Sequence, residues 1–321
     1  GVRIKVRLFG GWEFGPDALK QKDWVKTAYA KGVSMGGELP VAKAKAPSFV
    51  VWAVKDPDSG NLDRIQIVKG WSKNGQSFEK IYDVAWSGTR KPDPASGKVP
   101  AVGNTVNLAT ATYKNTIGAV ELKTVWTDPD FDPGLDAFYY ARVLEIPTPR
   151  WSTIQAVKMG RVPPTIPGPS IATATIQERA WTSPIWYTPS AEARKTVTPG
   201  VTVTELKQKG AVALGDAELK QLIVGKTVTV RNTVTGQRFE ILYGVDGRRL
   251  ITAMNGKTPE LDVMGDLLHG PQAQYEIRDG HLVTEVAGAE FDVTVYKLGD
   301  RYVASRSREF SYANYEIEEV K

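Results

Sequence analysis

The chain of 321 residues contains no cysteine and only two histidines. The missing thiols exclude disulfide bonds, thiol nucleophiles and zinc-thiolate sites, although they do not fix the cellular compartment. No glycine-rich phosphate loop and no Gly-x-Ser-x-Gly nucleophile motif is present. His269 and His281 are too few for a histidine-rich metal centre, and we interpret them as solvated or hydrogen-bonded side chains.

Long apolar runs are also missing. The longest, FVVWAV at 49–54, is far shorter than the roughly 20 residues that a membrane helix needs, so we expect no membrane span. The net charge of +5 comes from 41 basic and 36 acidic residues that are interspersed along the chain. Because no block of five like charges occurs, we expect no nucleic-acid partner.

The composition divides the chain into two parts. All nine tryptophans lie between Trp12 and Trp186, and 17 of the 20 prolines lie at or before Pro189. This shift predicts one domain over residues 1–189, a polar linker over 190–200 and a second domain over 201–321.

The first domain is predicted to be an immunoglobulin-like β-sandwich with one N-terminal helix. Apolar residues at helical spacing, followed by Gly32, predict a helix at about 17–31. Six strand segments follow, at 49–56, 62–71, 77–86, 119–126, 137–146 and 175–188. Several of them alternate apolar and polar residues, which is typical of sandwich strands.

The second domain is predicted to be a series of β-hairpins. Three turn pairs, Asp246-Gly247, Asp279-Gly280 and Gly299-Asp300, lie between runs of alternating hydrophobicity. Because a meander with open edges aggregates, we expect these strands to form a small antiparallel β-barrel or a strongly curved sheet.

Five segments of the first domain carry a family resemblance. They are VRIKVRLFGGWEF, AYAKGVSMGGELP, SFVVWAVKDPDSGNLDRIQIVKGW, VELKTVWTDPDFDPGLDAFYYARVLEIPTPRW and TIQERAWTSPIWYTP. In this order they resemble the C-terminal portion of the bacterial domain-of-unknown-function-3604 family, over residues 1–189. Members of that family carry, upstream of this region, a barrel similar to PHP (polymerase and histidinol phosphatase) metallophosphoesterases.

The resemblance implies that this chain is the non-catalytic accessory part of a PHP-type metal-dependent hydrolase. The PHP barrel is absent here, so divalent transition metals are expected only in that upstream domain, which is the implied partner. Gly1 is then a processing site or the edge of a longer protein, and the family's habit implies a periplasmic or secreted location. The alternative is a free-standing envelope binding protein for a sugar, a lipid or an anionic ligand.

Four aspartates form the most acidic loop of the chain. Asp128, Asp130, Asp132 and Asp136 surround Gly134, and their alternating spacing predicts a calcium site as one interpretation. The other interpretation, which we favour, is that Asp and Pro residues build the turn between two strands. No other cofactor is expected in this chain.

Aromatic and cationic residues offer the other candidate site. Arg150 and Trp151 follow two prolines, and a guanidinium beside an indole suits a sugar, an anion or a neighbouring domain. The other interpretation, which we favour, is that a tryptophan in a β-sandwich belongs to its core. Trp181 and Trp186 are five residues apart, so a regular strand places them on opposite faces. We therefore expect one of the two to be buried and the other to contact a loop or a partner.

Overall fold

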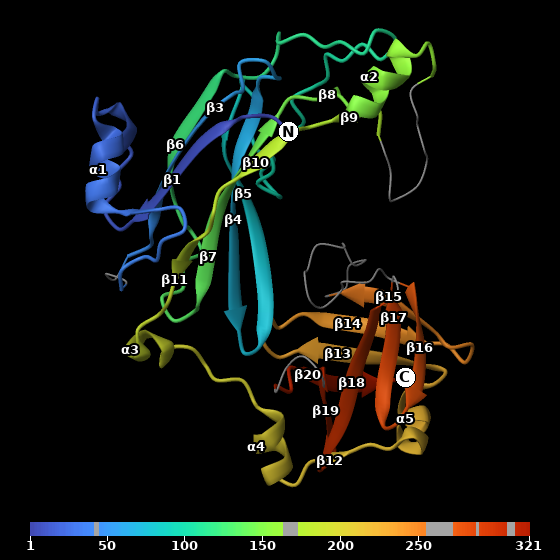
Figure 1. The fold of residues 1–321 in the computed structure, drawn as a ribbon. Helices are drawn as coiled ribbons and strands as arrows, with labels where there is room; N and C mark the ends of the chain where they lie inside the picture. The colour runs from blue at the N-terminus through green and yellow to red at the C-terminus, as the bar shows by residue number, and fades with distance from the viewer. Residues whose placement is uncertain (42–44, 163–172, 255–271, 287–288, 307–311) are drawn as a thin grey trace. The chain divides into compact units, whose positions relative to one another are not determined.

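The computed structural model describes residues 1–41, 45–162, 173–254, 272–286, 289–306 and 312–321. Within these residues the protein is mainly β and divides into two compact units (Figure 1). Unit 1 comprises Gly1–Trp71 and Lys80–Thr196, and unit 2 comprises Ser72–Glu79 and Val197–Lys321. No helix among these residues is long and apolar enough to cross a membrane.

Unit 1 is built on two antiparallel sheets. The first has the strand order β2 (Val33–Ser34), β1 (Lys5–Gly11), β3 (Ser48–Val54) and β6 (Glu121–Thr127). The second has the order β10 (Arg179–Trp181), β7 (Ala137–Glu145), β4 (Leu62–Lys73) and β5 (Gln76–Trp86), and β11 (Ile185–Tyr187) also pairs with β7. Two short strands, β8 (Thr148–Pro149) and β9 (Thr175–Ile176), pair separately. Five expected strand segments are found, and the sixth is divided into β9, β10 and β11.

The two sheets share one apolar core. Leu8 and Phe49 of the first sheet lie in the same buried cluster as Ile65, Tyr139 and Val143 of the second. The rings of Phe49 and Tyr139 meet with their centroids 4.5 Å apart. Because successive side chains of a strand point to opposite faces, only one face of each sheet is committed to this core.

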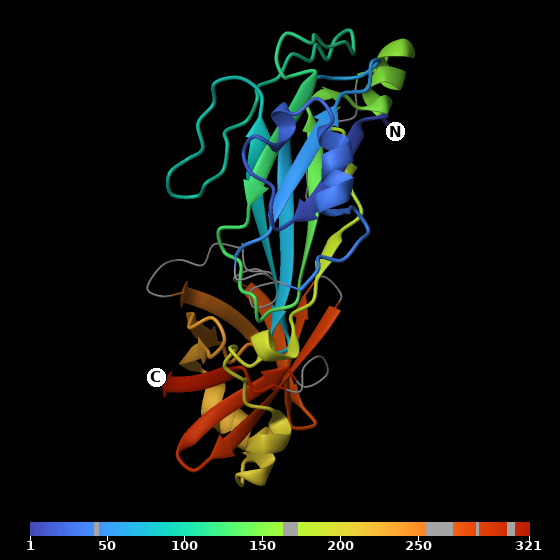
Figure 2. The ribbon, with the colours of Figure 1, turned by 90° about the vertical axis from the view of Figure 1, so that its left-hand side faces the viewer.

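Helices cover part of unit 1. A 3-10 turn at Ala18–Lys20 leads into α1 (Trp24–Lys31), which lies against the outer face of the first sheet by packing Ala28 near Phe9 and Val50 (Figure 2). A second α-helix, α2 (Trp151–Lys158), corrects the expectation of a single helix. Its first residue has no side-chain cap before it, so the usual sequence signal of a helix start is missing. A short helix, α3 (Ala191–Arg194), follows Ser190.

Unit 2 contains a closed antiparallel barrel of eight strands. Before the barrel come α4 (Val203–Gln208), β12 (Val212–Ala213) and α5 (Asp216–Ile223). The barrel strands are β13 (Lys226–Asn232), β14 (Arg238–Tyr243), β15 (Arg248–Met254), β16 (Gln272–Arg278), β17 (His281–Val286), β18 (Ala289–Leu298), β19 (Arg301–Arg306) and β20 (Tyr315–Val320). Each pairs with the next in the chain, and β20 pairs with β13 to close the ring. The expected antiparallel barrel is therefore confirmed.

The three expected turn pairs join barrel strands. Asp246-Gly247 joins β14 to β15, Asp279-Gly280 joins β16 to β17, and Gly299-Asp300 joins β18 to β19. Asp279 and Gly280 have φ angles of 54° and 74°, a conformation that Asp and Gly accept more readily than other residues. These turns connect neighbouring strands directly, which is why the chain order is also the order around the barrel.

A buried carboxyl group ends β7. Glu145 is fully buried, its Oε2 accepts a hydrogen bond of 2.5 Å from the Ser59 hydroxyl, and its Oε1 has no hydrogen-bond partner among the described residues. Burial raises the pKa of Glu145 above its ordinary value of 4.5, because the charged form is poorly solvated there. The folded protein therefore holds this proton more tightly than the unfolded chain does.

This carboxyl makes stability depend on pH in a defined direction. A group with a raised folded pKa stabilises the fold below its ordinary pKa of 4.5, and the contribution is lost as the pH rises toward the folded pKa. We expect Glu145→Gln to flatten the decline in the free energy of unfolding above that pH, measured by urea unfolding. The exposed Glu192→Gln is the control and keeps the wild-type profile. An unchanged slope in Glu145→Gln would contradict the prediction.

Candidate functional site

The barrel of unit 2 encloses a mostly apolar cavity. Alternate residues of each strand point inward, so that Phe239 and Ile241 of β14, Leu282 of β17 and Val293 of β18 line it together with Ile317 of β20. The cavity volume is about 140 Å³. An apolar cavity of roughly 150 Å³ is large enough for a benzene-sized molecule. The site therefore has room for one ring or a short aliphatic chain.

A cationic side chain lies in this apolar lining. Arg249 and Ile251 share the inward face of β15 and both line the cavity. Among the described residues, no hydrogen bond or ion pair engages the Arg249 guanidinium. Burial lowers the pKa of Arg249, yet an arginine keeps its proton in proteins. Arg249 is partly buried, and a positive charge that is partly withdrawn from water is unfavourable when no anion neutralises it.

Tyr243 lies next to this arginine. The two residues are directly opposite in the pairing of β14 with β15, and both line the cavity. Burial raises the pKa of Tyr243 to about 12, so its phenol stays protonated at neutral pH. Its ring is held edge-on by Tyr275, with centroids 5.1 Å apart. The lining of the cavity is thus mainly apolar, and the Arg249 guanidinium and the Tyr243 phenol lie next to each other in it; Arg306 also lines the cavity.

The two histidines are placed differently. His281 begins β17, and its Nδ1 is 3.0 Å from the Thr294 hydroxyl, so its interpretation as a hydrogen-bonded residue is confirmed. His269 lies outside the described residues. No group of three or more His, Cys, Asp or Glu side chains that could hold a metal occurs in the part of the chain that the structure describes.

The first two aspartates of the acidic loop are bound to lysine and tyrosine side chains. Asp128 is buried, 2.6 Å from the Lys69 amine, and accepts a hydrogen bond of 2.7 Å from the Tyr139 hydroxyl. Asp130 accepts hydrogen bonds from Lys80 and Tyr82, and these bonds lower its pKa. Both carboxylates therefore tie the loop to the neighbouring strands.

The other two aspartates have different roles. Asp132 accepts a hydrogen bond of 2.9 Å from the Gly134 amide and closes a turn. Asp136 forms an exposed ion pair with Arg194 at 2.5 Å. The structure does not bring the four carboxylates together around one point. This arrangement favours the turn interpretation, and the calcium site stays a prediction.

The predicted aromatic contacts are exposed. Trp151 begins α2 with 67% of its surface accessible, and the Arg150 Nε donates to the Thr173 carbonyl at 3.1 Å. Trp181 and Trp186 are 56% and 50% exposed, so the expectation that one of them is buried is wrong. The segment is interrupted at 182–184, and Trp181 and Trp186 pair with Arg142 and Phe138 of β7. Positions 138 and 142 lie on one face of β7, which places both indoles on that face as well.

Tyr243 and Arg249 were not among the site residues predicted from the sequence. Both lie in runs that alternate, but an arginine in a strand is read as an outward residue unless the barrel is closed around it. The adjacent pair Arg248-Arg249 offered a weak signal, since one of two successive residues in a barrel strand must point inward.

The fold and cavity define a mainly β protein whose second unit is a hollow barrel. A comparison with known protein families matches residues 1–189 to the family described as "Protein of unknown function (DUF3604)". Because the match covers more than half of the chain, the protein belongs to this family. Comparison with curated proteins and with solved structures found no match.

The pairing of Asp128 with Lys69 predicts a large effect on stability. Asp128→Asn leaves a buried lysine without its counter-ion, which costs about 3–5 kcal/mol in comparable buried pairs. Asp136→Asn removes one partner of an exposed pair and should cost less than about 1 kcal/mol. Urea unfolding of both variants measures the difference. Equal losses in the two variants would show that Asp128 and Lys69 do not act as a buried pair.

Proposed function

We propose that the chain is a non-catalytic binding module whose barrel takes a small amphipathic anion. The observation that carries this proposal is the Arg249 guanidinium, which faces an apolar cavity and has no hydrogen bond or ion pair among the described residues. A carboxylate is a natural partner, because a planar guanidinium binds it through two parallel hydrogen bonds. The Tyr243 phenol lies beside Arg249 and is suited to donate a third hydrogen bond to the same carboxylate.

The volume of the cavity limits the size of the ligand that it can hold. At about 140 Å³ the cavity is smaller than the roughly 300–1,000 Å³ of sites for drug-sized molecules. The apolar part of the ligand should therefore be an aromatic ring or a short alkyl chain. Aromatic and short-chain carboxylates fit both the volume and the charge.

Benzoate and its neutral isostere benzamide test the role of charge. We expect benzoate to bind the full chain and Arg249→Met to lower its affinity about 10-fold to 100-fold, since a hydrogen bond to a charged group contributes roughly 1.5–3 kcal/mol. Benzamide should bind the wild-type protein about as weakly as benzoate binds Arg249→Met. Isothermal titration calorimetry at low ionic strength measures all of these affinities.

The matched control is Arg248→Met. Arg248 is the exposed neighbour on the same strand, and its guanidinium lies 3.9 Å from the Asp246 carboxylate. This variant should bind benzoate as the wild type does, and a thermal melt of Arg249→Met should show a folded protein. Equal binding of benzamide and benzoate, or an equal loss in Arg248→Met, would contradict the proposal.

The second part of the proposal concerns unit 1 and rests on the family resemblance. We infer that unit 1 is an immunoglobulin-like β-sandwich that accompanies a PHP-type metal-dependent hydrolase domain, in the periplasm or outside the cell. The support is family membership over residues 1–189 and the two antiparallel sheets that share a core. The PHP-type domain would hold the transition metals and perform the chemistry.

Isolation of the protein from its native cells tests this second part. Intact-mass and N-terminal analysis should find the chain joined to, or purified with, an upstream polypeptide rich in His, Asp and Glu. That polypeptide should hydrolyse a phosphomonoester only when loaded with a divalent metal. A native protein that starts at Gly1, with no upstream coding sequence, would contradict this part and leave the barrel proposal intact.

A further inference from the structure

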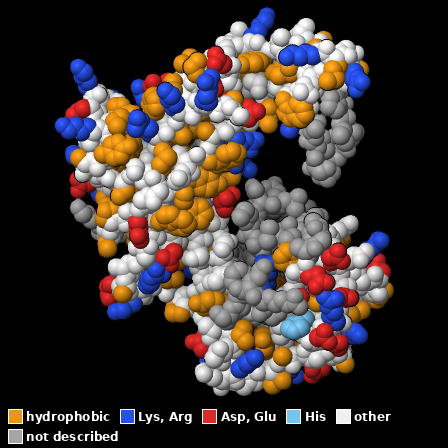
Figure 3. All heavy atoms as spheres, in the orientation of Figure 1, with side chains coloured by type: hydrophobic (Ala, Val, Ile, Leu, Met, Phe, Trp, Pro, Cys, Tyr) orange, Lys and Arg blue, Asp and Glu red, His pale blue; other side chains and the backbone are white. Residues whose placement is uncertain are grey.

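The second sheet of unit 1 has an outer face that carries aromatic side chains. Tyr139, Ala141 and Val143 of β7 belong to the shared core, so Phe138 and Arg142 point to the other side. The strand pairing then places further aromatic residues on that outer face. In Figure 3, hydrophobic side chains gather over the region of β4 and β7.

The exposed indoles of Trp181 and Trp186 lie at two separate positions along this surface. Trp186 is directly opposite Phe138, and Trp181 is directly opposite Arg142. The two positions on β7 are four residues apart, which corresponds to roughly 13 Å along the strand. Both indoles are about half exposed. A ligand that contacts both must therefore be extended, and longer than one sugar ring.

A polar pocket adjoins the Trp181 end of the surface. It has a volume of about 370 Å³ and is lined by Gln66, Arg142, Gln177 and Arg179 together with the loop at 101–103. The pocket is therefore larger than the barrel cavity, and polar side chains share its lining with apolar residues such as Leu144 and Pro147.

Two guanidinium groups at this pocket retain unused donors. The Arg142 Nε donates to Gln66 at 2.8 Å, and its terminal nitrogens have no hydrogen bond or ion pair among the described residues. Arg179 donates weakly from Nε to the Gln177 carbonyl at 3.4 Å, and its guanidinium lies 5.9 Å from the centre of the Trp181 ring. In the described part of the chain its terminal nitrogens are likewise unengaged.

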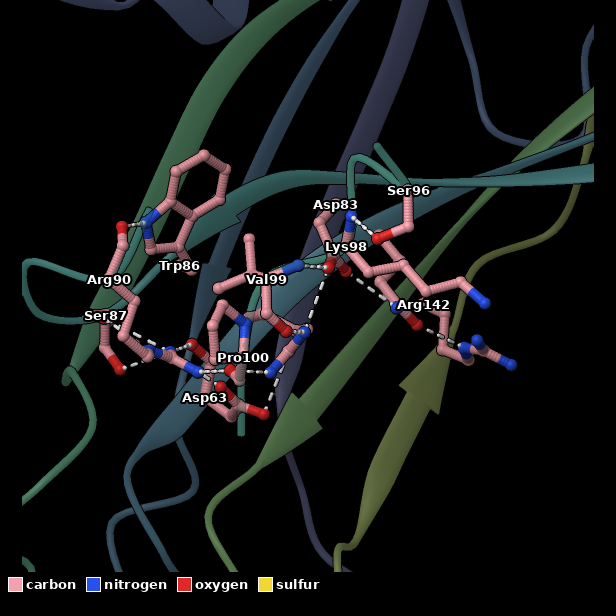
Figure 4. A network of polar contacts seen from close by, with 12 residues as sticks. Asp63, Asp83, Trp86, Ser87, Arg90, Ser96, Lys98, Val99, Pro100 and Arg142 are labelled. Atoms are coloured by element: carbon pink, nitrogen blue, oxygen red, sulfur yellow. Dashed lines mark hydrogen bonds and ion pairs between the residues drawn. The ribbon is translucent and has the colours of Figure 1, made fainter. Parts of the chain in front are cut away.

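The wall behind these arginines is held by a network of buried ion pairs. The Arg64 guanidinium is bound to Asp63 at 3.0 Å and to Asp83 at 2.9 Å. Arg90 pairs with the same Asp63 at 2.7 Å, and Gln66 donates to Asp83 at 2.7 Å (Figure 4). The charges inside this network balance, with two arginines and two aspartates.

The network also positions Arg142. Gln66 joins Arg142 to Asp83, so the orientation of the guanidinium is fixed by a chain of hydrogen bonds that ends in a buried ion pair. Figure 4 shows Arg142 at one end of this arrangement and Arg90 at the other. Because Arg64 and Arg90 are neutralised, Arg142 and Arg179 carry the surplus positive charge at the pocket.

We propose that this outer face binds an acidic oligosaccharide, with a uronate carboxylate at Arg142 and Arg179 and a sugar ring against Trp181. The C–H groups on the face of a sugar ring pack on an indole, whose π face is electron-rich. A carboxylate accepts paired hydrogen bonds from a guanidinium. Trp186 and Phe138 extend the aromatic contact along the strand.

Charge distribution favours a sugar over a nucleic acid. A single-stranded nucleic acid needs a positively charged groove that follows its backbone over several nucleotides. Here the two arginines with unused donors lie together at one end of the surface, and the end at Trp186 and Phe138 is formed by aromatic residues. This pattern matches a ligand with an isolated carboxylate.

Tetragalacturonate is the probe for this site, with neutral cellotetraose and an oligothymidylate as comparisons. Calorimetry with the full chain should detect tetragalacturonate, and cellotetraose and oligothymidylate should bind at least about tenfold more weakly. Trp181→Ala and Arg142→Gln should each lower the affinity for tetragalacturonate at least about tenfold. Raising the salt concentration should weaken binding of wild type more than of Arg142→Gln.

Two control variants replace exposed residues of the same kinds, one aromatic and one arginine, away from the proposed site. Tyr29→Ala removes an aromatic residue that is 58% exposed on α1, and Arg7→Gln removes an exposed arginine on β1. Both should bind tetragalacturonate within about twofold of wild type. Three results would overturn the proposal: no binding of tetragalacturonate, equal or tighter binding of cellotetraose or oligothymidylate, or equal losses in the control variants. Circular dichroism confirms that each variant is folded.

Discussion

Successive side chains of a β-strand point to opposite faces of the sheet, and both units use this alternation to separate the core from surfaces that can bind. On β7, Tyr139 enters the core of unit 1 while Tyr140 lies on the outer face. On β15, Arg249 enters the barrel while Arg248 remains exposed. A shift of one residue in either pairing would exchange these faces. The apolar residues that favour the correct register therefore also determine which polar side chains reach each site.

The cationic side chains of the two units occur in two different environments. The buried cations of unit 1 have close counter-ions, as with Lys69 and Asp128 or Arg64 and Asp83. Such pairs offset much of the free energy lost when charges leave water, and they hold strands and loops in place. Arg249 and Arg142 differ, because a cavity or pocket lies beside each of them and their terminal nitrogens have no hydrogen bond or ion pair among the described residues. These two positions carry the binding proposals, since a ligand anion there would supply the missing partner.

Much of the fold followed from local patterns. Alternation and the Asp-Gly and Gly-Asp turns predicted the barrel, because a tight turn between alternating runs leaves little choice but a hairpin. Of the helix expected near 17–31, the α-helical part is Trp24–Lys31, after a 3-10 turn at Ala18–Lys20. Apolar spacing and a following glycine, which are both local signals, predicted this part. The helix α2 was not expected, because its start has no side-chain cap. The prediction that one of Trp181 and Trp186 is buried was wrong, because a break between the two residues changes the alternation of side chains. Only the pairing of the two short strands with β7 shows this break.

The amino-acid sequence by itself determined the β class, the family over residues 1–189 and the turn chemistry of the barrel, because each depends on residues close together in the chain or on ordered motifs. It could not identify Arg249 as a cavity residue or Arg142 as the end of a hydrogen-bonded chain. Those roles depend on strands distant in sequence that meet in space, on closure of the barrel, and on which carboxylates are already bound by other cations. Tertiary structure therefore decided the sites, because whether a charge has a partner depends on all of the groups packed around it.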